Sequence, residues 1–184
     1  TELLAPYRTD RNTPLLKERL SEMGVPVVFS AVVPDEETPM EETLRAGLAR
    51  CRFVFVCGGL GPTVDDVTRS VAASVLGVPL VEDAPSLTAI ETRFRGRGIQ
   101  MPDVNRRQAL IPKGAEVLQN PTGTAPGVIA HTGRGACLVL LPGPPSELAS
   151  MFDAEVRPRL KRETPPLLGR VQAVVGVCGL PESV

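Results

Sequence analysis

The stretch VFVCGGLGPTVDDVTRSVAASVLG, residues 54–77, decides the fold because it joins a strand pattern to a helix pattern through a flexible loop. Its opening apolar run is typical of a strand that helices cover on both faces. Three glycines and two adjacent acids follow. Beyond the acids, apolar and polar residues recur as in an amphipathic helix. This order predicts a buried parallel strand that ends at Cys57, then a tight loop, then a helix over 66–76.

The rest of the chain alternates helical and strand-like patterns around this unit. The spacing of apolar residues predicts helices over 12–24 and 34–51, and a β-branched run between them predicts a strand over 25–33. The remaining expected elements are helices over 84–96 and 103–110, strands over 115–118, 126–131 and 136–141, and a helix pair over 145–161. This alternation belongs to the α/β class. We expect three α/β/α layers around a mostly parallel central sheet.

Composition argues against several classes of function. The 184 residues suffice for one domain with a substantial core. The 20 basic and 21 acidic residues leave a net charge of -1 without runs of like charge, so no electrostatic footprint for nucleic acid or an anionic membrane is present. No apolar stretch approaches the roughly 20 residues of a membrane span, and the first residues lack a signal-peptide pattern. We expect a cytoplasmic protein without nucleic-acid or membrane partners.

Cysteine and histidine offer little chemistry in this sequence. The four cysteines are spread along the chain without a C-x-x-C pair, which disfavours zinc sites and disulfide frameworks. The single histidine, His131, is interpreted as a structural or surface residue. Ser-His-Asp and Cys-His mechanisms are therefore nearly excluded. Carboxylates, metals, amides and backbone N–H groups remain as sources of chemistry.

Both ends of the sequence look interrupted. TELL, residues 1–4, has the form of the exit of a strand whose body would lie upstream. After two adjacent prolines, the strand-like run at 170–184 has the form of a new unit that has just begun. We therefore expect one domain over 1–168 that lacks its first strand, followed over 169–184 by a linker and the start of a second module.

The glycine-rich loop after Cys57 is a candidate phosphate site. A parallel strand leads to the carboxyl edge of the sheet, where ligands of open α/β sheets bind. Free N–H groups at the start of the next helix, with Thr63 and Thr68, can hold phosphate oxygens. Asp65 and Asp66 would repel phosphate unless a divalent cation lies between, or unless one acid only caps the helix. The loop matches neither the dinucleotide fingerprint nor the P-loop.

Several ordered motifs give a more specific signal than this loop alone. They are TELL, DRNTPLLKERLSEMG (10–24), GGLGPTVDDVTR (58–69), NRRQALIPKGAEVLQNPTGTAPG (105–127) and LPGPPSEL (141–148). Together they resemble the N-terminal domain of the competence/damage-inducible CinA family, which shares the fold of the MoaB and Mog molybdopterin-binding proteins. The resemblance covers residues 1 to about 168, and GLPES near the end is similar to the start of that family's next module.

The resemblance implies a role for each motif. Asp66 would be the acid shared with the molybdopterin relatives, and Asp65 and Asp66 would hold a divalent metal, Mg²⁺, Mn²⁺ or Co²⁺. Asp35 would approach the same site as a third catalytic acid, unless it is an exposed helix cap. The implied substrate-binding residues are Gly58, Gly59, Gly61, Thr63, Thr68, Asn105, Arg106, Gln108, Asn120, Gly123, Thr124, Gly127, Pro142 and Gly143.

Three functions are compatible with these motifs. The resemblance implies metal-dependent hydrolysis of a nucleotide diphosphate such as ADP-ribose, in which the cation shields the pyrophosphate and activates a water. Binding or adenylylation of molybdopterin needs the same loop and a pterin pocket. A non-catalytic nucleotide-binding or oligomerisation module is the third. The relatives also imply a homo-oligomer.

Overall fold

The structure, a computed structural model, describes residues 9–163 and confirms the alternation of helices and strands. The predicted linker and second module at 169–184 lie outside the described residues. In chain order the elements are α1 (Asn12–Glu22), α2 (Glu37–Arg50), β1 (Phe53–Cys57), α3 (Thr68–Leu76), β2 (Leu80–Glu82), α4 (Ala84–Gly96), the 3-10 helix η2 (Asp103–Ala109), β3 (Leu110–Pro112), β4 (Glu116–Leu118), β5 (Gly127–His131), β6 (Cys137–Leu141), α5 (Pro145–Met151), the π-helical turn η3 (Phe152–Val156) and α6 (Arg157–Glu163).

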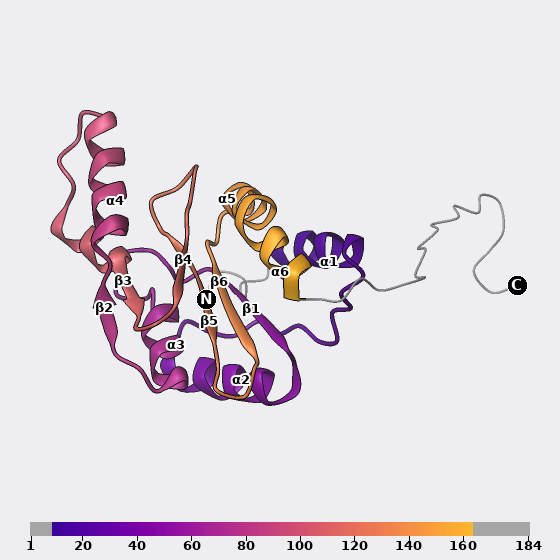
Figure 1. The fold of residues 1–184 in the computed structure, drawn as a ribbon. Helices are drawn as coiled ribbons and strands as arrows, with labels where there is room; N and C mark the ends of the chain where they lie inside the picture. The colour runs from indigo at the N-terminus through magenta and orange to yellow at the C-terminus, as the bar shows by residue number, and fades with distance from the viewer. Residues whose placement is uncertain (1–8, 164–184) are drawn as a thin grey trace, which may run out of the picture.

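The central sheet is mixed, with the strand order β1-β6-β5-β4 (Figure 1). β1 and β6 are parallel, whereas β5 is antiparallel to both of its neighbours, β4 and β6. The α/β class is confirmed, but the expected predominance of parallel pairs is wrong for the described strands. Parallel neighbours need a crossover of a dozen or more residues. Only the short loops 119–126 and 132–136 join β4, β5 and β6, so these strands form hairpins.

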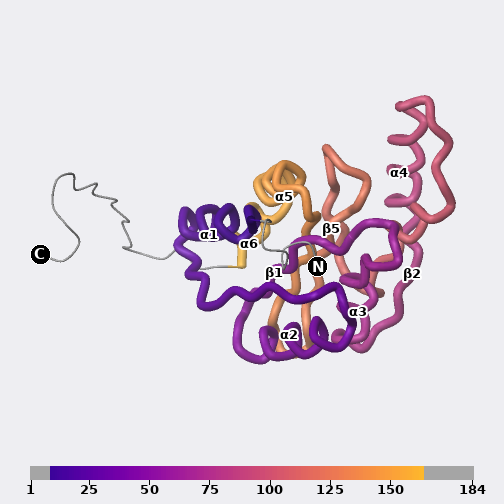
Figure 2. Tube along the Cα trace, turned by 180° about the vertical axis from the view of Figure 1, so that it is seen from behind, coloured from indigo at the N-terminus to yellow at the C-terminus, as the bar shows by residue number. Residues whose placement is uncertain are grey.

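Helices cover both faces of this sheet and complete the three expected layers. In Figures 1 and 2, α1, α5 and α6 lie on one side of the strands, and α2 and α3 lie on the other. The side chains of β6 alternate between the two layers. Val139 and Leu141 pack in the core with α1 and α5, whereas Leu138 and Leu140 pack in the core with α2 and α3. Because β6 is buried on both faces, its sequence is uniformly apolar.

The prediction of a strand over 25–33 is wrong. The structure assigns no strand to these residues, and Val27, Val28, Phe29 and Val32 are 38 to 73% exposed. A β-branched run becomes a strand only when a neighbour supplies the other half of its hydrogen-bond ladder. Among the strands within 9–163, β1 pairs with β6 alone, and every residue of β1 is only half-buried.

A smaller lobe extends from the sheet beside α3. β2 and β3 form an antiparallel pair, and α4 and η2 lie next to it at one end of the molecule (Figure 1). Asp83 caps α4 by accepting a hydrogen bond from the Ser86 N–H at 2.9 Å, and Pro85 occupies the first turn. Neither β2 nor β3 is expected from the sequence, because three residues are too few to show a period.

Candidate functional site

The loops that follow β1 and β6 meet at the carboxyl edge of the sheet. Cys57 and Leu141 are paired in register at the ends of these strands. The N–H of Gly58 donates to the Leu141 carbonyl at 2.9 Å, and a Cβ built on Gly143 would lie 3.5 Å from the Gly58 Cα. The structure therefore brings Gly58 and Gly143 together, with bare backbone where the two strands end.

Both the backbone conformation and a close contact with Thr68 require glycine in the loop after β1. Gly58 and Gly59 have φ values of 100° and 66°, a region that side chains disfavour. A Cβ on Gly59 would overlap the Thr68 hydroxyl, at 2.1 Å. That hydroxyl donates to the Gly58 carbonyl at 2.9 Å, and Thr68 is buried. The Thr68 hydroxyl, which the sequence analysis expects to bind phosphate, therefore holds the loop in shape.

Asp66 organises the same loop from within. Its carboxylate accepts the N–H of Gly61 at 2.8 Å, the N–H of Thr63 at 2.8 Å and the Thr63 hydroxyl at 2.5 Å. It is therefore a loop cap, and the position before α3 is held by Val67, which makes no side-chain cap. The neighbouring Asp65 is exposed, and its carboxylate has no hydrogen bond among the described residues. The two predicted acids thus have different surroundings.

Arg69 is a site residue that the sequence analysis missed. It is only 4% exposed, and its guanidinium donates to the carbonyls of Leu60, at 2.5 Å, and Gly61, at 2.8 Å. Burial lowers the pKa of Arg69 to about 10, and the Asp66 carboxylate opposes that shift. The side chain therefore remains a cation at neutral pH and clamps the loop. The available signal was its spacing of three residues from Ala72 on the buried face of α3.

The start of α1 reaches the same edge of the sheet. The Asn12 side-chain amide donates to the Gly143 carbonyl at 2.8 Å, while its Oδ1 is buried without a hydrogen-bond partner in the described part of the chain. The Asp10 carboxylate accepts the N–H groups of Asn12 and Thr13. Burial opposes ionisation of Asp10, yet the hydrogen bonds from Thr13 and Asn12 leave its pKa lowered. Asn12 is a second missed residue, because this contact spans the whole domain.

The NRRQ motif on η2 is split between two environments. Asn105 and Gln108 are buried, and the Asn105 amide donates to the Gln108 side-chain oxygen at 3.2 Å. Arg106 is exposed and pairs with Glu82 at 3.0 Å. By contrast, Arg107 donates to the Thr63 carbonyl at 3.3 Å and so joins η2 to the glycine-rich loop. The sequence selected Arg106 for the substrate, but Arg107 is the arginine that touches the loop.

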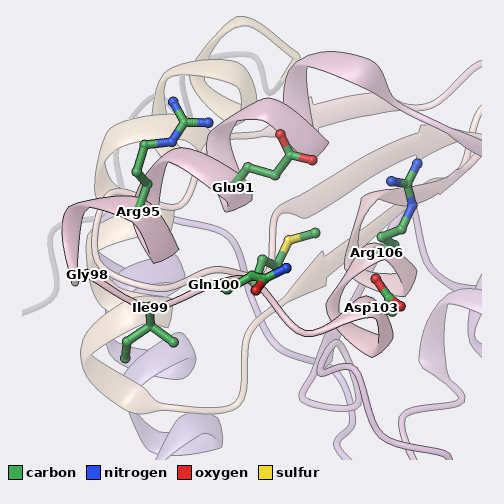
Figure 3. Close-up of a pocket in the computed structure, with 8 residues that line it drawn as sticks. Glu91, Arg95, Gly98, Ile99, Gln100, Asp103 and Arg106 are labelled. Atoms are coloured by element: carbon green, nitrogen blue, oxygen red, sulfur yellow. The ribbon is translucent and has the colours of Figure 1, made fainter.

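Arg106 instead lines a separate surface pocket between α4 and η2. The pocket has a volume of about 500 Å³, and Glu91, Arg95 and Asp103 also line it (Figure 3). The figure shows charged side chains from both elements around the backbone of residues 98–101. No residue of the glycine-rich loop lines this pocket. Arg106 and the loop are therefore not parts of one cavity.

Asn120 holds together the loop before β5. Its side-chain oxygen accepts the N–H groups of Thr122 and Gly123, and its amide donates to the Ala125 carbonyl and to the Glu147 carboxylate, the last at 2.8 Å. Glu147 lies in the first turn of α5, after the LPGPP turn. A Cβ on Gly123 would overlap that carboxylate. This glycine therefore lets the loop close on Glu147.

Three other predicted residues, Gly127, Pro142 and Thr124, lie at or near this loop. A Cβ on Gly127 would lie 2.4 Å from the Met151 sulfur, so this glycine lets β5 pass close to α5. Pro142 is buried at the end of β6. Thr124 is half-buried in the loop. Packing accounts for Gly127 and Pro142, and the predicted contacts of all three residues with a substrate stay predictions.

A larger cavity than the one that Arg106 lines lies beside β1 and reaches this edge. Its volume is about 990 Å³, and one wall is the segment 24–33 while the other is β1. Five residues that the sequence assigns to the site also line it. These are Asp35, Gly58, Gly59, Thr68 and Gly143. Asp65 and Asp66 do not line this cavity, so the predicted acids are divided between the cavity and the loop.

Comparison with known proteins assigns the family. A family model described as a probable molybdopterin binding domain matches residues 1–162. A CinA-like protein of Solibacter usitatus is 40% identical over 183 residues, which cover 100% of this chain and 44% of that protein. The structure of CinA from Thermoplasma acidophilum matches with a TM-score of 0.78 and 30% identity, over 86% of this chain and 92% of that chain. The chain is a CinA-like member of the molybdopterin-binding domain family.

The CinA-like domain also shares the fold of the molybdenum-cofactor proteins. MoaB from Thermus thermophilus matches with a TM-score of 0.55 at 20% identity, over 85% of this chain and 83% of that chain. At this identity the likeness shows the fold alone. The domain spans 38% to 44% of the length of the first curated relatives it matches. No helix within residues 9–163 combines the length and the hydropathy needed to span a bilayer.

The donor groups of the CinA-like domain suit one type of cation site and not another. Among the described residues, no three His, Cys, Asp or Glu side chains gather into a metal-binding group. A carboxylate has about four acceptor positions, and hydrogen bonds to Asp66 occupy three of them. These residues do not fit a cage made of protein ligands alone. They fit Mg²⁺ bound through one or two carboxylates, with water and phosphate oxygens as the other ligands.

Proposed function

We propose that the CinA-like domain hydrolyses a nucleotide diphosphate such as ADP-ribose, with a divalent cation, at the carboxyl edge of β1 and β6. The observation that supports this most is the meeting of Gly58 and Gly143 at the start of a loop that also carries the exposed Asp65. Bare backbone permits the close approach of phosphate oxygens, and an unbonded carboxylate is available to a cation that those oxygens also bind.

The residues of the loop have separate roles in this proposal. Asp65 contacts the cation directly, and Asp66 offers its remaining acceptor position while it keeps Gly61 and Thr63 in place. Arg69 and Arg107 fix the backbone carbonyls of the loop. The cation supplies charge neutralisation for the pyrophosphate and lowers the pKa of a bound water. Cytoplasmic location and the absence of nucleic-acid partners stay predictions.

The test is release of AMP from ADP-ribose by the purified protein in the presence of Mg²⁺, Mn²⁺ or Co²⁺. Asp65→Ala should lower kcat by at least about a hundredfold, a size typical of one electrostatic contact in a transition state. Asp103→Ala is the matched control, because Asp103 is exposed and lines the separate pocket. Full activity of Asp65→Ala would remove Asp65 from the mechanism.

Binding of a pterin phosphate is the second candidate, and the description of the matching family model favours it. The same edge would hold the phosphate, and the cavity of about 990 Å³ that lies beside β1 has room for an attached ring. A titration with molybdopterin and with its adenylylated form separates this candidate from the first. Binding of ADP-ribose without release of AMP under any of the three metals would instead support a non-catalytic nucleotide module.

Self-association is a further part of the proposal, because the relatives of the sequence imply a homo-oligomer. Light scattering during size-exclusion chromatography measures the molar mass directly. A mass of 19.6 kDa, that of a single chain, at every concentration would contradict it.

A further inference from the structure

The loop 119–126, which precedes β5, opens at the same edge of the sheet as the two loops of the site. Val128 of β5 pairs with Leu140 of β6, and Leu141 of β6 pairs with Cys57 of β1. Because β5 is antiparallel to β6, it begins where β6 ends. The strand register therefore brings three loops to one edge: the glycine-rich loop, the turn after β6 and the loop before β5.

Arg93 of α4 holds the loop 119–126 from the side of the smaller lobe. Its guanidinium donates to the Asn120 carbonyl at 3.2 Å and to the Pro121 carbonyl at 2.7 Å. Hydrogen bonds from a charged donor are stronger than those between neutral groups. Arg93 is half-buried, whereas Arg95 on the same helix is exposed and lines the separate pocket beside η2. Of these two arginines, Arg93 is therefore the one that fixes the backbone of the loop.

Glu147 of α5 holds the same loop from its other side. Figures 1 and 2 both show the loop before β5 standing between α4 and α5. The Glu147 carboxylate accepts the side-chain amide of Asn120 at 2.8 Å, and Gly123 leaves room for it, because a Cβ there would overlap the carboxylate. Glu147 follows the turn at Gly143 by one helical turn. This bond therefore ties the loop to the turn after β6.

Asn120 connects these two anchors to the rest of the loop. Its backbone carbonyl accepts from Arg93, its side-chain amide donates to Glu147, and its side-chain oxygen accepts the N–H groups of Thr122 and Gly123. Neither Arg93 nor Glu147 lines either of the two cavities described above. The two charged side chains thus act on the loop backbone through hydrogen bonds, at a remove from any ligand at the edge.

We propose that Arg93 and Glu147 are positioning residues: they hold the loop 119–126 at the carboxyl edge so that Gly123 and Thr124 meet the bound ligand, which neither of the two charged side chains touches. The inference rests on the proposed binding of a nucleotide diphosphate at this edge. A loop held in its bound conformation has less entropy to lose when the ligand arrives. Release of the loop should therefore weaken binding more than it slows the chemical step.

Two substitutions of Glu147 separate a hydrogen-bond acceptor from a catalytic charge in the complete 184-residue chain. Glu147→Gln keeps an oxygen that can accept the Asn120 amide, and Glu147→Ala removes it. With Mg²⁺ present, Glu147→Ala should raise both the KM for ADP-ribose and the Kd for inorganic pyrophosphate at least about tenfold, with kcat changed less than about threefold. Glu147→Gln should keep all three constants within about threefold of the parent. Equal losses in both variants would overturn the proposal, because the charge itself would then act.

Arg93 is tested with a conservative variant and a matched control on the same helix. Arg93→Lys keeps a charged donor, Arg93→Met keeps none, and Arg95→Met removes an exposed arginine from the separate pocket. Arg93→Met should raise KM and Kd at least about fivefold, Arg93→Lys less, and Arg95→Met not at all. Hydrogen exchange of the amides in 119–126 should speed up at least about tenfold in Arg93→Met and Glu147→Ala, with β6 unchanged as evidence that the fold is intact.

The two readouts distinguish failure of this inference from failure of the proposed hydrolysis. A parent protein that binds pyrophosphate without releasing AMP removes the hydrolysis, and the Kd values of the variants still decide the positioning role. A parent that binds neither ADP-ribose nor pyrophosphate overturns both, because the edge then has no phosphate ligand. Faster exchange in 119–126 with unchanged KM and Kd overturns the positioning role alone, since Arg93 and Glu147 would then only stabilise the loop.

Discussion

Two adjacent aspartates show why residue type alone does not define a role. Asp66 accepts three hydrogen bonds within its loop, and Asp65 accepts none among the described residues. Asp66→Ala leaves the N–H groups of Gly61 and Thr63 without their partner, so the free energy of unfolding should fall by about 1–2 kcal/mol. Asp65→Ala should change it by less than about 0.5 kcal/mol. Urea denaturation measures both, and equal losses would contradict the assignment.

Arg69 gives a second prediction at the scale of the single residue. Arg69→Met keeps most of the side-chain volume but leaves two carbonyls, those of Leu60 and Gly61, without a charged donor. We expect a loss of about 2 kcal/mol in unfolding free energy. The control is Arg107→Met, since Arg107 is exposed and should contribute less than about 0.5 kcal/mol. If both variants unfold at the same urea concentration as the parent, the Arg69 hydrogen bonds do not contribute to stability.

The buried thiols of Cys57 and Cys137 predict how stability depends on pH. Burial raises the pKa of each thiol to about 12, with smaller contributions from neighbouring carboxylates. An unfolded thiol titrates at about 8.5. The folded state therefore keeps a proton that the unfolded state loses, and the stabilisation present below pH 8.5 is lost as pH rises toward 12. Urea denaturation at pH 8 and pH 10.5 should show this fall, and Cys137→Ala should reduce the slope.

At the scale of the element, helices were predictable and partnerless strands were not. The spacing of apolar residues placed α4 at its observed bounds, and Asp83 marked its start. The β-branched run at 25–33 predicted a strand in the same way, because such a run forms a strand when a neighbouring strand is present to pair with it. β2 and β3 were missed, since three residues carry no period and their pairing depends on a contact across about 30 residues of chain. The local spacing of apolar residues shows which element a segment can form, and pairing with a neighbouring strand decides whether a strand forms there.

Substitution of two glycines by alanine, one in a strand and one in a helix, should change stability in opposite directions. Gly127 opens β5, where a Cβ would lie 2.8 Å from the Leu140 carbonyl oxygen, and the backbone of the paired strand β6 cannot move far. Gly127→Ala should therefore destabilise by about 1–3 kcal/mol, the usual cost of overpacking. Gly96 ends α4 with nothing near its Cβ position. Gly96→Ala should stabilise by about 0.5 kcal/mol, because alanine loses less backbone entropy in a helix. Thermal melts of both variants measure the difference in sign.

At the scale of the whole molecule, topology explains which parts of the site the sequence revealed. The loops after β1 and β6 were predictable partners, since adjacent parallel strands deliver their loops to one edge. Asn12 and Arg107 could not be found this way. Their contacts, to the Gly143 and Thr63 carbonyls, join segments 131 and 44 residues apart. Long-range hydrogen bonds to backbone leave no local pattern, so a single sequence does not contain that signal.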